Sequence, residues 1–474
     1  MGIPNILNTG KSGLLASKLA IATTGHNITN ASTEGYSRQR VQTTTAPPQG
    51  GGFGHNVVGT GTQVLRVERI NDEYIDKQIR TSQRDLSHFE EKDLSLRQIE
   101  NVFNEMDGDG LNRLVSKFFN EFRILSDEPE SDAVRQAVRE ASQSMVNDFH
   151  RLRSEVVDIG GHIDARIEGY TAEVNTLVTE ITNLNEKIRI IEPTGGSPND
   201  LLDKRDLALK KLSTFLDTTS HYDKQRNVCV DLRGGGPLIS GSSHDVLTLD
   251  RTPADEDGKL DGSYDVQSGG KISGPLTHHI KGGKLGALIE VRDKTVTTIL
   301  NRLDDMAFAI TESVNGIHMQ GVTLEGLTNI AYFKPLLSKS NAAELMSLST
   351  EVKNNINNIT TGLLPNSPGD NRIAIGISQI QNKKIMNEGH STIDEFYNSI
   401  VSDVGVATAK NKFSMNQEKD IVTQLNKIRD QISGVSIDEE TTDLLQFQHA
   451  FDASAKIIQI ADDLLKTVLS LKRD

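Results

Sequence analysis

The sequence contains no tryptophan, and aromatic residues make up only 4% of its 474 positions. Hydrophobic residues of all kinds reach 36%. Long helices packed side by side depend mainly on leucine, isoleucine, valine and alanine, whereas a compact enzyme of this size uses more large rings. The chain is long enough for several domains. The composition therefore favours a protein built mainly from long helices.

Cysteine is nearly absent as well. Cys229 is the only one in the sequence, so no disulfide bond can form within the chain. We interpret Cys229 as a small core residue rather than a catalytic thiol.

The chain also lacks an excess of positive charge, since 51 Lys and Arg residues face 65 Asp and Glu residues and the net charge is −14. Such a chain repels phosphate, which argues against nucleic-acid binding and against a basic membrane-binding patch. No apolar run approaches the roughly 18 residues of a membrane span, so we expect no membrane insertion. Residues 1–12 lack the basic start and apolar segment of a Sec-type signal peptide, so we expect no cleaved signal of that kind.

Motifs that would carry chemistry are missing or incomplete. Gly10-Lys11-Ser12 resembles the end of a phosphate-binding loop, but the glycine required five residues earlier is Asn5. His278 and His279 have no further ligands at metal spacing, and we interpret them as a solvated pair. The cluster 203–206 carries both signs of charge, which favours a salt-bridged helix surface over a pair of catalytic carboxylates. We expect no catalytic residues, no cofactor and no metal.

Apolar spacing and turn residues predict a sequence of long helices. Residues 1–12 are expected to be loose, and one or two strands are expected near residues 63–69. Residues 221–280, rich in Gly, Ser and Asp, predict a small β subdomain, and residues 321–370 are mixed. Helices are predicted at about 12–30, 72–106, 111–125, 132–191, 285–318, from 392 onward, and 438–471.

The last predicted helix carries two apolar stripes side by side, and one stripe is enough for a single helical partner. The first contains Phe447, Ala450, Ser454, Ile457, Ala461, Leu464, Val468 and Leu471, and the second Leu444, Phe451, Ala455, Ile458, Leu465 and Leu469. We interpret the pair of stripes as contacts with more than one neighbour, because exposed apolar stripes usually mark interfaces. An ordinary buried helix in one globular core is the alternative.

Two terminal motifs resemble bacterial flagellar axial proteins. Residues 13–17 and 23–41, which include an Asn-rich segment and then Gly35-Tyr36-Ser37-Arg38-Gln39, resemble the start of these proteins in the form seen in the hook-associated protein 1 family. Residues 433–458 resemble that family's C-terminal motif. Segments 199–206, 282–288 and 314–318 agree in order, so the resemblance covers nearly the whole chain. Only residues 321–370 occupy the place where larger members carry an outer β insertion, so we expect a reduced outer part.

The resemblance implies a mainly α fold with a small β part. It implies paired terminal coiled-coil helices, a rod-like bundle of long helices and a small outward β subdomain. The expected domains are an inner terminal coiled coil (1–40 and 435–474), a long-helix bundle (41–220 and 281–434) and the β subdomain (221–280). It also implies a structural subunit at the junction between hook and filament.

The same resemblance implies the partners and the assembly surface. Expected partners are other copies in a helical ring, the hook protein, a second junction protein on the filament side, an export chaperone and the flagellar type III export apparatus. The expected location is the extracellular flagellum. We predict an assembly interface at Leu14, Leu15, Leu19, Ile28, Leu444, Phe447, Phe451, Ile457, Ile458, Leu464, Leu465 and Val468.

A chaperone site is predicted within residues 440–471, because the apolar stripes would otherwise invite association before export. Its residues are Leu444, Phe447, Phe451, Ile458 and Leu465. Two alternatives remain open for the whole chain. It could be another axial protein, such as a hook or rod protein, or an enzyme or adhesin on a coiled-coil stalk.

Overall fold

The computed structural model describes residues 3–47, 59–103, 110–194, 196–251, 263–269, 275–365 and 367–471. The chain divides into two compact units. Unit 1 contains Met1–Leu86, Glu173–Val246 and Gln417–Asp474, and unit 2 contains Ser87–Ala172 and Leu247–Asn416. The helices α2 (Glu73–Val102), α4 (Asp132–Ile191) and α11 (Ile393–Ser433) each contribute residues to both units.

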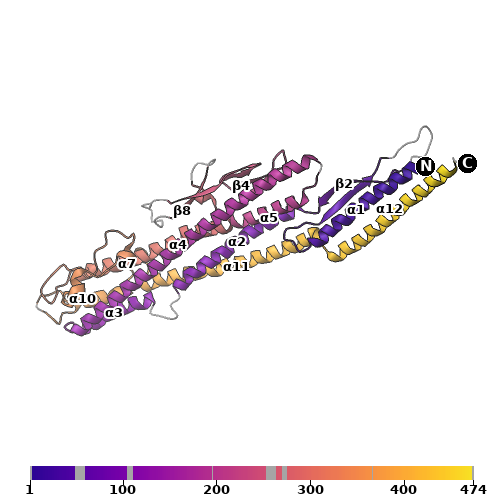
Figure 1. The fold of residues 1–474 in the computed structure, drawn as a ribbon. Coiled ribbons are helices and arrows are strands. Elements are labelled where there is room, and N and C mark those ends of the chain that lie inside the picture. The colour runs from indigo at the N-terminus through magenta and orange to yellow at the C-terminus, as the bar shows by residue number, and fades with distance from the viewer. Residues whose placement is uncertain are drawn as a thin grey trace. The chain divides into compact units, whose positions relative to one another are not determined.

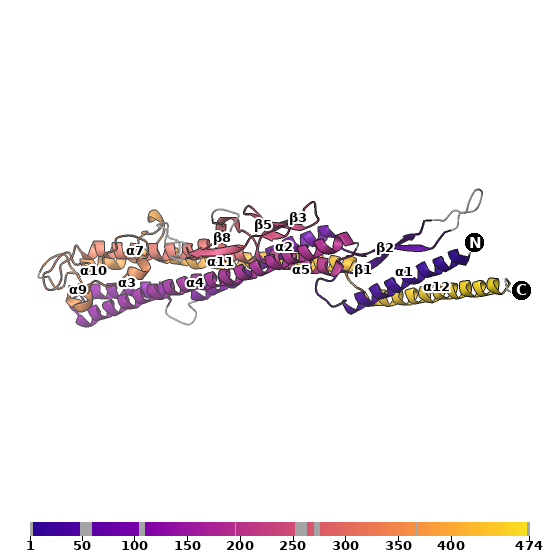
Figure 2. The same ribbon diagram turned by 45° about the horizontal axis from the view of Figure 1, so that its top comes forward.

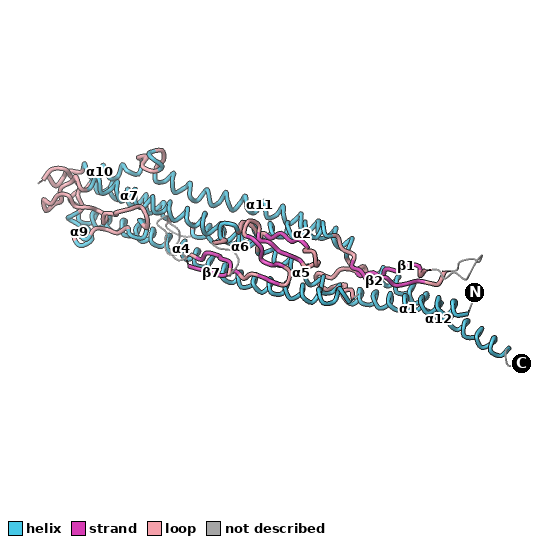
Figure 3. Tube along the Cα trace, turned by 90° about the horizontal axis from the view of Figure 1, so that it is seen from above, coloured by secondary structure: helices cyan, strands magenta, loops and turns pink. Residues whose placement is uncertain are grey.

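Unit 1 is organised around a pair of terminal helices, α1 (Ile3–Thr29) and α12 (Ile437–Leu471), which lie side by side in opposite directions (Figures 1 and 2). The antiparallel hairpin of β1 (Gln39–Thr45) and β2 (Thr62–Arg69) packs along α1 (Figure 3). Unit 1 also contains the short helix η2 (Glu192–Thr194), α5 (Asn199–Phe215) and one four-stranded sheet. That sheet has the order β3 (Thr218–Tyr222), β4 (Val228–Leu232), β5 (Gly236–Ser240), β6 (Ser243–His244), with antiparallel neighbours.

In unit 2, α3 (Leu111–Asp127) and a long broken helix each pack against short helical segments. The broken helix joins α6 (Gly283–Glu290), a π-helical turn η4 (Val291–Val296) and α7 (Thr297–His318). Strands β7 (Leu247–Arg251) and β8 (Tyr264–Ser268) form a separate antiparallel pair. The remaining elements are η3 (Thr277–His279), α8 (Ala342–Leu345), α9 (Thr350–Asn354), η5 (Ile356–Asn358), α10 (Arg372–Ser378), η6 (Gln379–Asn382) and η7 (Asn387–Gly389).

The interior of unit 2 contains an aromatic cluster with a buried histidine. Phe118, Phe122, Tyr332 and Phe333 pack ring against ring and are fully buried. His318 donates from Nδ1 to the Ile330 carbonyl at 2.8 Å and accepts the Thr360 N–H at Nε2 at 2.9 Å. Burial lowers the pKa of His318 to about 4, because a charged imidazole would lose its water and gain no acceptor.

Local side chains explain where several helices begin. Asp72 precedes α2, and its Oδ1 accepts the N–H groups of Tyr74 and Ile75. Thr392 and Glu395 form a reciprocal capping box at the start of α11. Between α11 and α12, Gly434 leaves no room for a Cβ atom because the Asp430 carbonyl occupies that space. The corner therefore depends on a glycine.

Most predicted elements are confirmed, including α4 at its predicted bounds and α12. The fold class of mainly α structure with a small β part and paired terminal helices is also confirmed. The predicted loose N-terminus is wrong, because α1 is helical from Ile3 and packs against α12. The helix predicted to reach residue 106 ends at Val102, and residues 104–109 lie outside the described part. The predicted β region forms two sheets, one in each unit.

Two side-chain interpretations need correction. Cys229 is half-buried on β4 rather than in the core. Asp203 and Arg205 lie on a helix with salt bridges nearby, as expected, but both side chains are buried rather than at the surface. His278 and His279 are exposed, which confirms the solvated pair. Within the described residues, no helix is long and apolar enough to cross a membrane.

Candidate assembly interface

Close packing of α1 on α12 depends on small residues along α1. A Cβ atom at Gly10 would lie 2.8 Å from Ile458 Cγ1 and 3.2 Å from Ile457 Cγ2. At Gly13 it would lie 2.7 Å from Ser454 Oγ. Because those positions carry no side chain, the two backbones approach more closely than larger residues would allow. The small residues therefore fix where the helices cross.

The other end of the α1–α12 pair is held by a buried asparagine. Asn27 Nδ2 donates to the Gln39 carbonyl and to Glu440 Oε2, both at 2.9 Å. Its Oδ1 accepts the Tyr36 hydroxyl at 2.8 Å and the Gln39 N–H at 3.0 Å. Asn27 is 1% exposed, and Gln39 and Glu440 are buried as well, so these two partners would lose a hydrogen bond without access to water if Asn27 were removed. One amide thus ties the end of α1 to the following turn and to the start of α12.

Arg38 forms ion pairs with three carboxylates in the first turns of α12. Its Nε lies 2.6 Å from Glu440 Oε1, its Nη1 lies 2.8 Å from Glu439 Oε2, and its Nη2 lies 3.3 Å from Asp443 Oδ2. Partial burial is the largest single effect on the pKa of Arg38 and lowers it, but the charges of Glu440 and Glu439 and the hydrogen bonds to both together leave the pKa raised. Glu440 is almost fully buried, so the arginine supplies the countercharge that its carboxylate requires.

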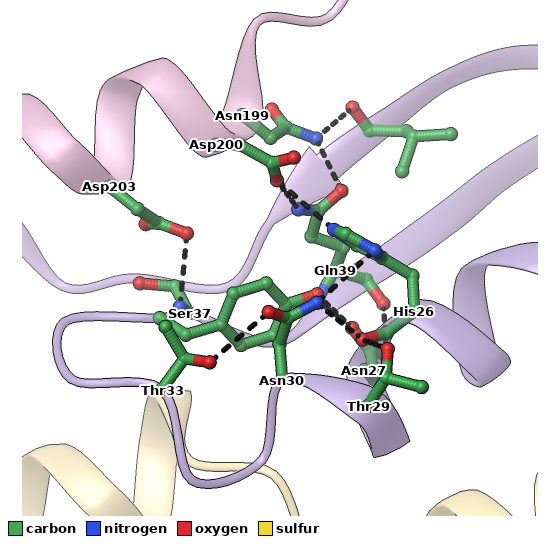
Figure 4. A network of polar contacts seen from close by, with 12 residues as sticks. His26, Asn27, Thr29, Asn30, Thr33, Ser37, Gln39, Asn199, Asp200 and Asp203 are labelled. Carbon is green, nitrogen blue, oxygen red and sulfur yellow. Dashed lines mark hydrogen bonds and ion pairs between the residues drawn. The ribbon is translucent and has the colours of Figure 1, made fainter.

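The start of α5 completes the same network, as Figure 4 shows. Asp200 Oδ1 accepts Gln39 Nε2 at 2.8 Å and lies 3.2 Å from His26 Nε2. Asn199 Nδ2 donates to Gln39 Oε1 at 3.1 Å, and the Ser37 N–H donates to Asp203 Oδ2 at 3.1 Å. Burial raises the pKa of Asp203, and Arg69 opposes that rise from 2.9 Å.

We name this network the polar node. It consists of His26, Asn27, Tyr36, Ser37, Arg38, Gln39, Asn199, Asp200, Asp203, Glu439, Glu440 and Asp443. The node joins α1, the turn before β1, α5 and α12 within unit 1. It can hold the terminal helices in register, because most of its buried polar groups have defined partners.

The predicted interface residues fall into two groups. Half-buried residues are Leu14, Ile28, Leu444, Phe447, Phe451 and Ile458, and exposed ones are Leu15, Leu19, Ile457, Leu464, Leu465 and Val468. Opposite pairs such as Gly10 with Ile458 and Asn27 with Glu440 set the register of the helices. In that register, Val468 lies beyond the start of α1. The assembly role of these residues stays a prediction.

Sequence reasoning missed the polar node as a site. In the sequence, its residues stand out through the resemblance of their segments, through the charge cluster 203–206 and through the proposed chaperone segment that begins at Glu440, and none of these signals predicts the network. A buried polar network leaves a weak signal in one sequence, because its members are separated by more than 400 residues, as Asn27 and Glu440 are. The sequence signal that points to the polar node is the concentration of Asn, Gln and charged residues at the end of α1 and the start of α12.

A shallow groove lies between α1, β1 and α12, with a volume of about 390 Å³. Small side chains of α1, such as Ala16 and Ala20, form one side, and Phe447 lies on another.

Among the residues that the structure describes, no group of three or more His, Cys, Asp or Glu side chains could hold a metal ion.

Comparisons with known proteins agree with this architecture. Residues 96–333 match a family model described as the helical domain of flagellar hook-associated protein FlgK. Residues 430–471 match the C-terminal model of flagellar basal body rod proteins FlgEFG.

Full-length relatives are similar along the whole chain. Flagellar hook-associated protein 1 of Bacillus subtilis is 28% identical over 501 residues, covering 98% of this chain and 97% of that protein. The protein of the same name from Salmonella typhimurium is 23% identical over 557 residues, covering 99% of this chain and all of that protein.

A solved structure shares the fold. It is described as the flagellar hook junction protein FlgK from Burkholderia pseudomallei, and it matches with a TM-score of 0.66 at 16% identity, over 75% of this chain and all of that one. With half of the chain matched by the helical-domain model, the chain belongs to the flagellar hook-associated protein FlgK family.

Proposed function

We propose that this chain is a structural subunit of the bacterial flagellum that forms the junction between hook and filament. The observation that carries the proposal is the closed pair of α1 and α12, held at one end by the polar node, in a chain of the FlgK family. A subunit that must carry mechanical load benefits from two termini locked together, since neither helix can slide without breaking buried hydrogen bonds.

The assembly role belongs to the outward surfaces of the terminal helices. Leu15, Leu464 and Val468 are exposed in the single chain, and burying such side chains against a neighbour is favourable by roughly 1.5–3 kcal/mol each. Other copies in a helical ring are the first partners. The hook protein on one side and a second junction protein on the other complete the set. The chain has no catalytic activity in this proposal and needs no cofactor.

Location and export follow from the same role. The chain belongs to the flagellum, outside the cell, and it leaves the cell through the flagellar type III export apparatus. An export chaperone covers α12 before export, at Leu444, Phe447, Phe451, Ile458 and Leu465. A truncation ending at Gly434 removes that segment, so it is expected to lose chaperone binding. Retention of full affinity would place the chaperone site elsewhere.

The proposed domains are those expected from the sequence. Residues 1–40 and 435–474 form the inner coiled coil, residues 41–220 and 281–434 form the helix bundle, and residues 221–280 form the outward β part. In the proposed helical ring of copies, the coiled coil is the innermost part.

A hook or rod protein remains the second candidate, because residues 430–471 match the C-terminal model of rod proteins. That segment alone does not discriminate between axial proteins. The longer match over residues 96–333 favours the junction protein.

Gene deletion tests the proposal. In the source bacterium, cells without this chain should export filament protein into the medium and keep hooks that bear no filament. Complementation with the full chain should restore filaments. Normal filaments in the deletion strain would reject the junction role, and loss of hooks as well as filaments would favour the rod or hook alternative.

A further inference from the structure

The outward face of α1 is basic and apolar. Helical spacing places Leu7, Lys11, Leu15, Lys18 and Ala22 on one stripe, at steps of four, four, three and four residues. All five are exposed, and Leu19 beside them is exposed too. The whole helix contains two lysines and no acidic residue. Neither lysine forms an ion pair with any residue in the described part of the chain.

The outward face of α12 has the opposite charge. This helix contains seven acidic residues and two lysines. Arg38 of the same chain neutralises Glu439, Glu440 and Asp443 at one end. The acids that remain turned outward are Asp438, Asp452, Asp462 and Asp463, of which the last two share Lys466.

Apolar side chains accompany those acids. Ile457, Ile460, Leu464 and Val468 follow one another at steps of three and four residues along an exposed flank. Leu445 is exposed on the same side as Asp452. Lys456 and Lys466 are the two lysines of α12, against the four outward acids Asp438, Asp452, Asp462 and Asp463. The face is therefore apolar with a net negative charge, and the single chain covers only the opposite side of α12.

From this charge complementarity, we propose that the basic stripe of α1 docks on the acidic outward face of α12 in a second copy of this chain. The two faces are different surfaces, so the contact is head-to-tail and can repeat around a ring or helix. Apolar side chains supply the buried area, and the lysine–carboxylate pairs set the orientation and exclude a contact between two copies of the same face. The inference rests on the proposed function and names the partner surface within that assembly.

Charge reversal tests the contact. In the source bacterium, the double variant Lys11→Glu/Lys18→Glu should lower the ratio of chain in isolated flagella to chain in the medium by about tenfold or more. Asp452→Lys/Asp463→Lys should lower it similarly. The chain carrying all four substitutions should recover incorporation, because every interface then meets opposite charges again. Lys77→Glu/Lys224→Glu changes the net charge equally at exposed positions outside both faces and should incorporate normally.

Each other outcome overturns the inference. Normal incorporation of both double variants, failure of the fourfold variant, or equal loss in the Lys77/Lys224 control would reject the contact. If the variants are not exported, carbodiimide coupling of purified, differently labelled copies of the wild-type chain tests the contact instead. This reagent joins lysines to carboxylates that lie in contact. The expected product links Lys11 or Lys18 to an α12 acid of another copy, and its absence rejects the contact. Absence of the wild-type chain from flagella would instead reject the proposed function.

Discussion

Single buried polar residues determine how the termini of this chain are joined. Asn27 uses both ends of its amide, and Arg38 divides its donors among three carboxylates. These roles could not be predicted from the sequence, because an asparagine near a helix end is more often a local cap or turn residue. The motif could be recognised, but its hydrogen bonds depend on a partner about 400 positions away.

Replacing Asn27 tests the polar node. Asn27→Ala removes four hydrogen bonds and leaves buried donors and acceptors unpaired, so we expect a loss of roughly 2–4 kcal/mol in the local stability of unit 1. Amide hydrogen exchange of α1 and α12 measures that change. Asn8→Ala, an exposed position of the same helix, is the matched control and should change little. Unchanged exchange in Asn27→Ala would mean that the node does not hold the helices.

A second prediction at the residue scale concerns His318 and the dependence of stability on pH. Its pKa is near 6.5 when unfolded and about 4 when folded, so the unfolded chain takes up the proton first as the pH falls. Its contribution to stability is complete above pH 6.5 and declines between about pH 6.5 and 4, at up to about 1.4 kcal/mol per pH unit. Urea unfolding of unit 2 in His318→Gln should lack this part of the slope. The exposed His162→Gln should keep it, and equal slopes in the two variants would contradict the assignment.

At the scale of elements, the sequence predicted most helices, because apolar spacing and turn residues are local signals. The start of α1 was missed for a physical reason. Residues 3–12 contain Gly, Asn and Pro, which indicate a loose end, yet Gly10 is what permits contact with Ile458. Tertiary packing therefore overrides local propensity there. The division of the β strands into two sheets depends on long-range pairing, which the strand patterns could not give.

Substitutions at two glycines of α1 distinguish the effect of packing against α12 from the effect of helix propensity. Gly10→Ala places a methyl group 2.8 Å from Ile458 Cγ1, so we expect weaker pairing of α1 with α12. Gly25 has no neighbouring atom within 4 Å of an added Cβ, so Gly25→Ala should stabilise the helix by roughly 0.5–1 kcal/mol. Hydrogen exchange of α1 reports both changes. Similar effects of the two substitutions would contradict the close packing at Gly10.

At the scale of the whole molecule, substitutions in α12 can distinguish effects on folding from effects on assembly. Ile458 contacts the Gly10 region within the chain, whereas Leu465 is 38% exposed. We expect Leu465→Asp to melt like the wild type by circular dichroism and yet fail to enter flagella, because its charge would be buried only after assembly. Ile458→Asp should weaken α1–α12 pairing in the monomer as well. Normal incorporation of Leu465→Asp would remove this residue from the assembly surface.

The position of the chain in the flagellum is the most direct test of the central claim. Gold-labelled antibodies against this chain, applied to isolated hook–filament complexes and viewed by electron microscopy, should mark a single narrow band between hook and filament. Label along the hook, along the filament or at the rod would contradict a junction subunit, and so would flagella that carry no label while the strain expresses and exports the chain.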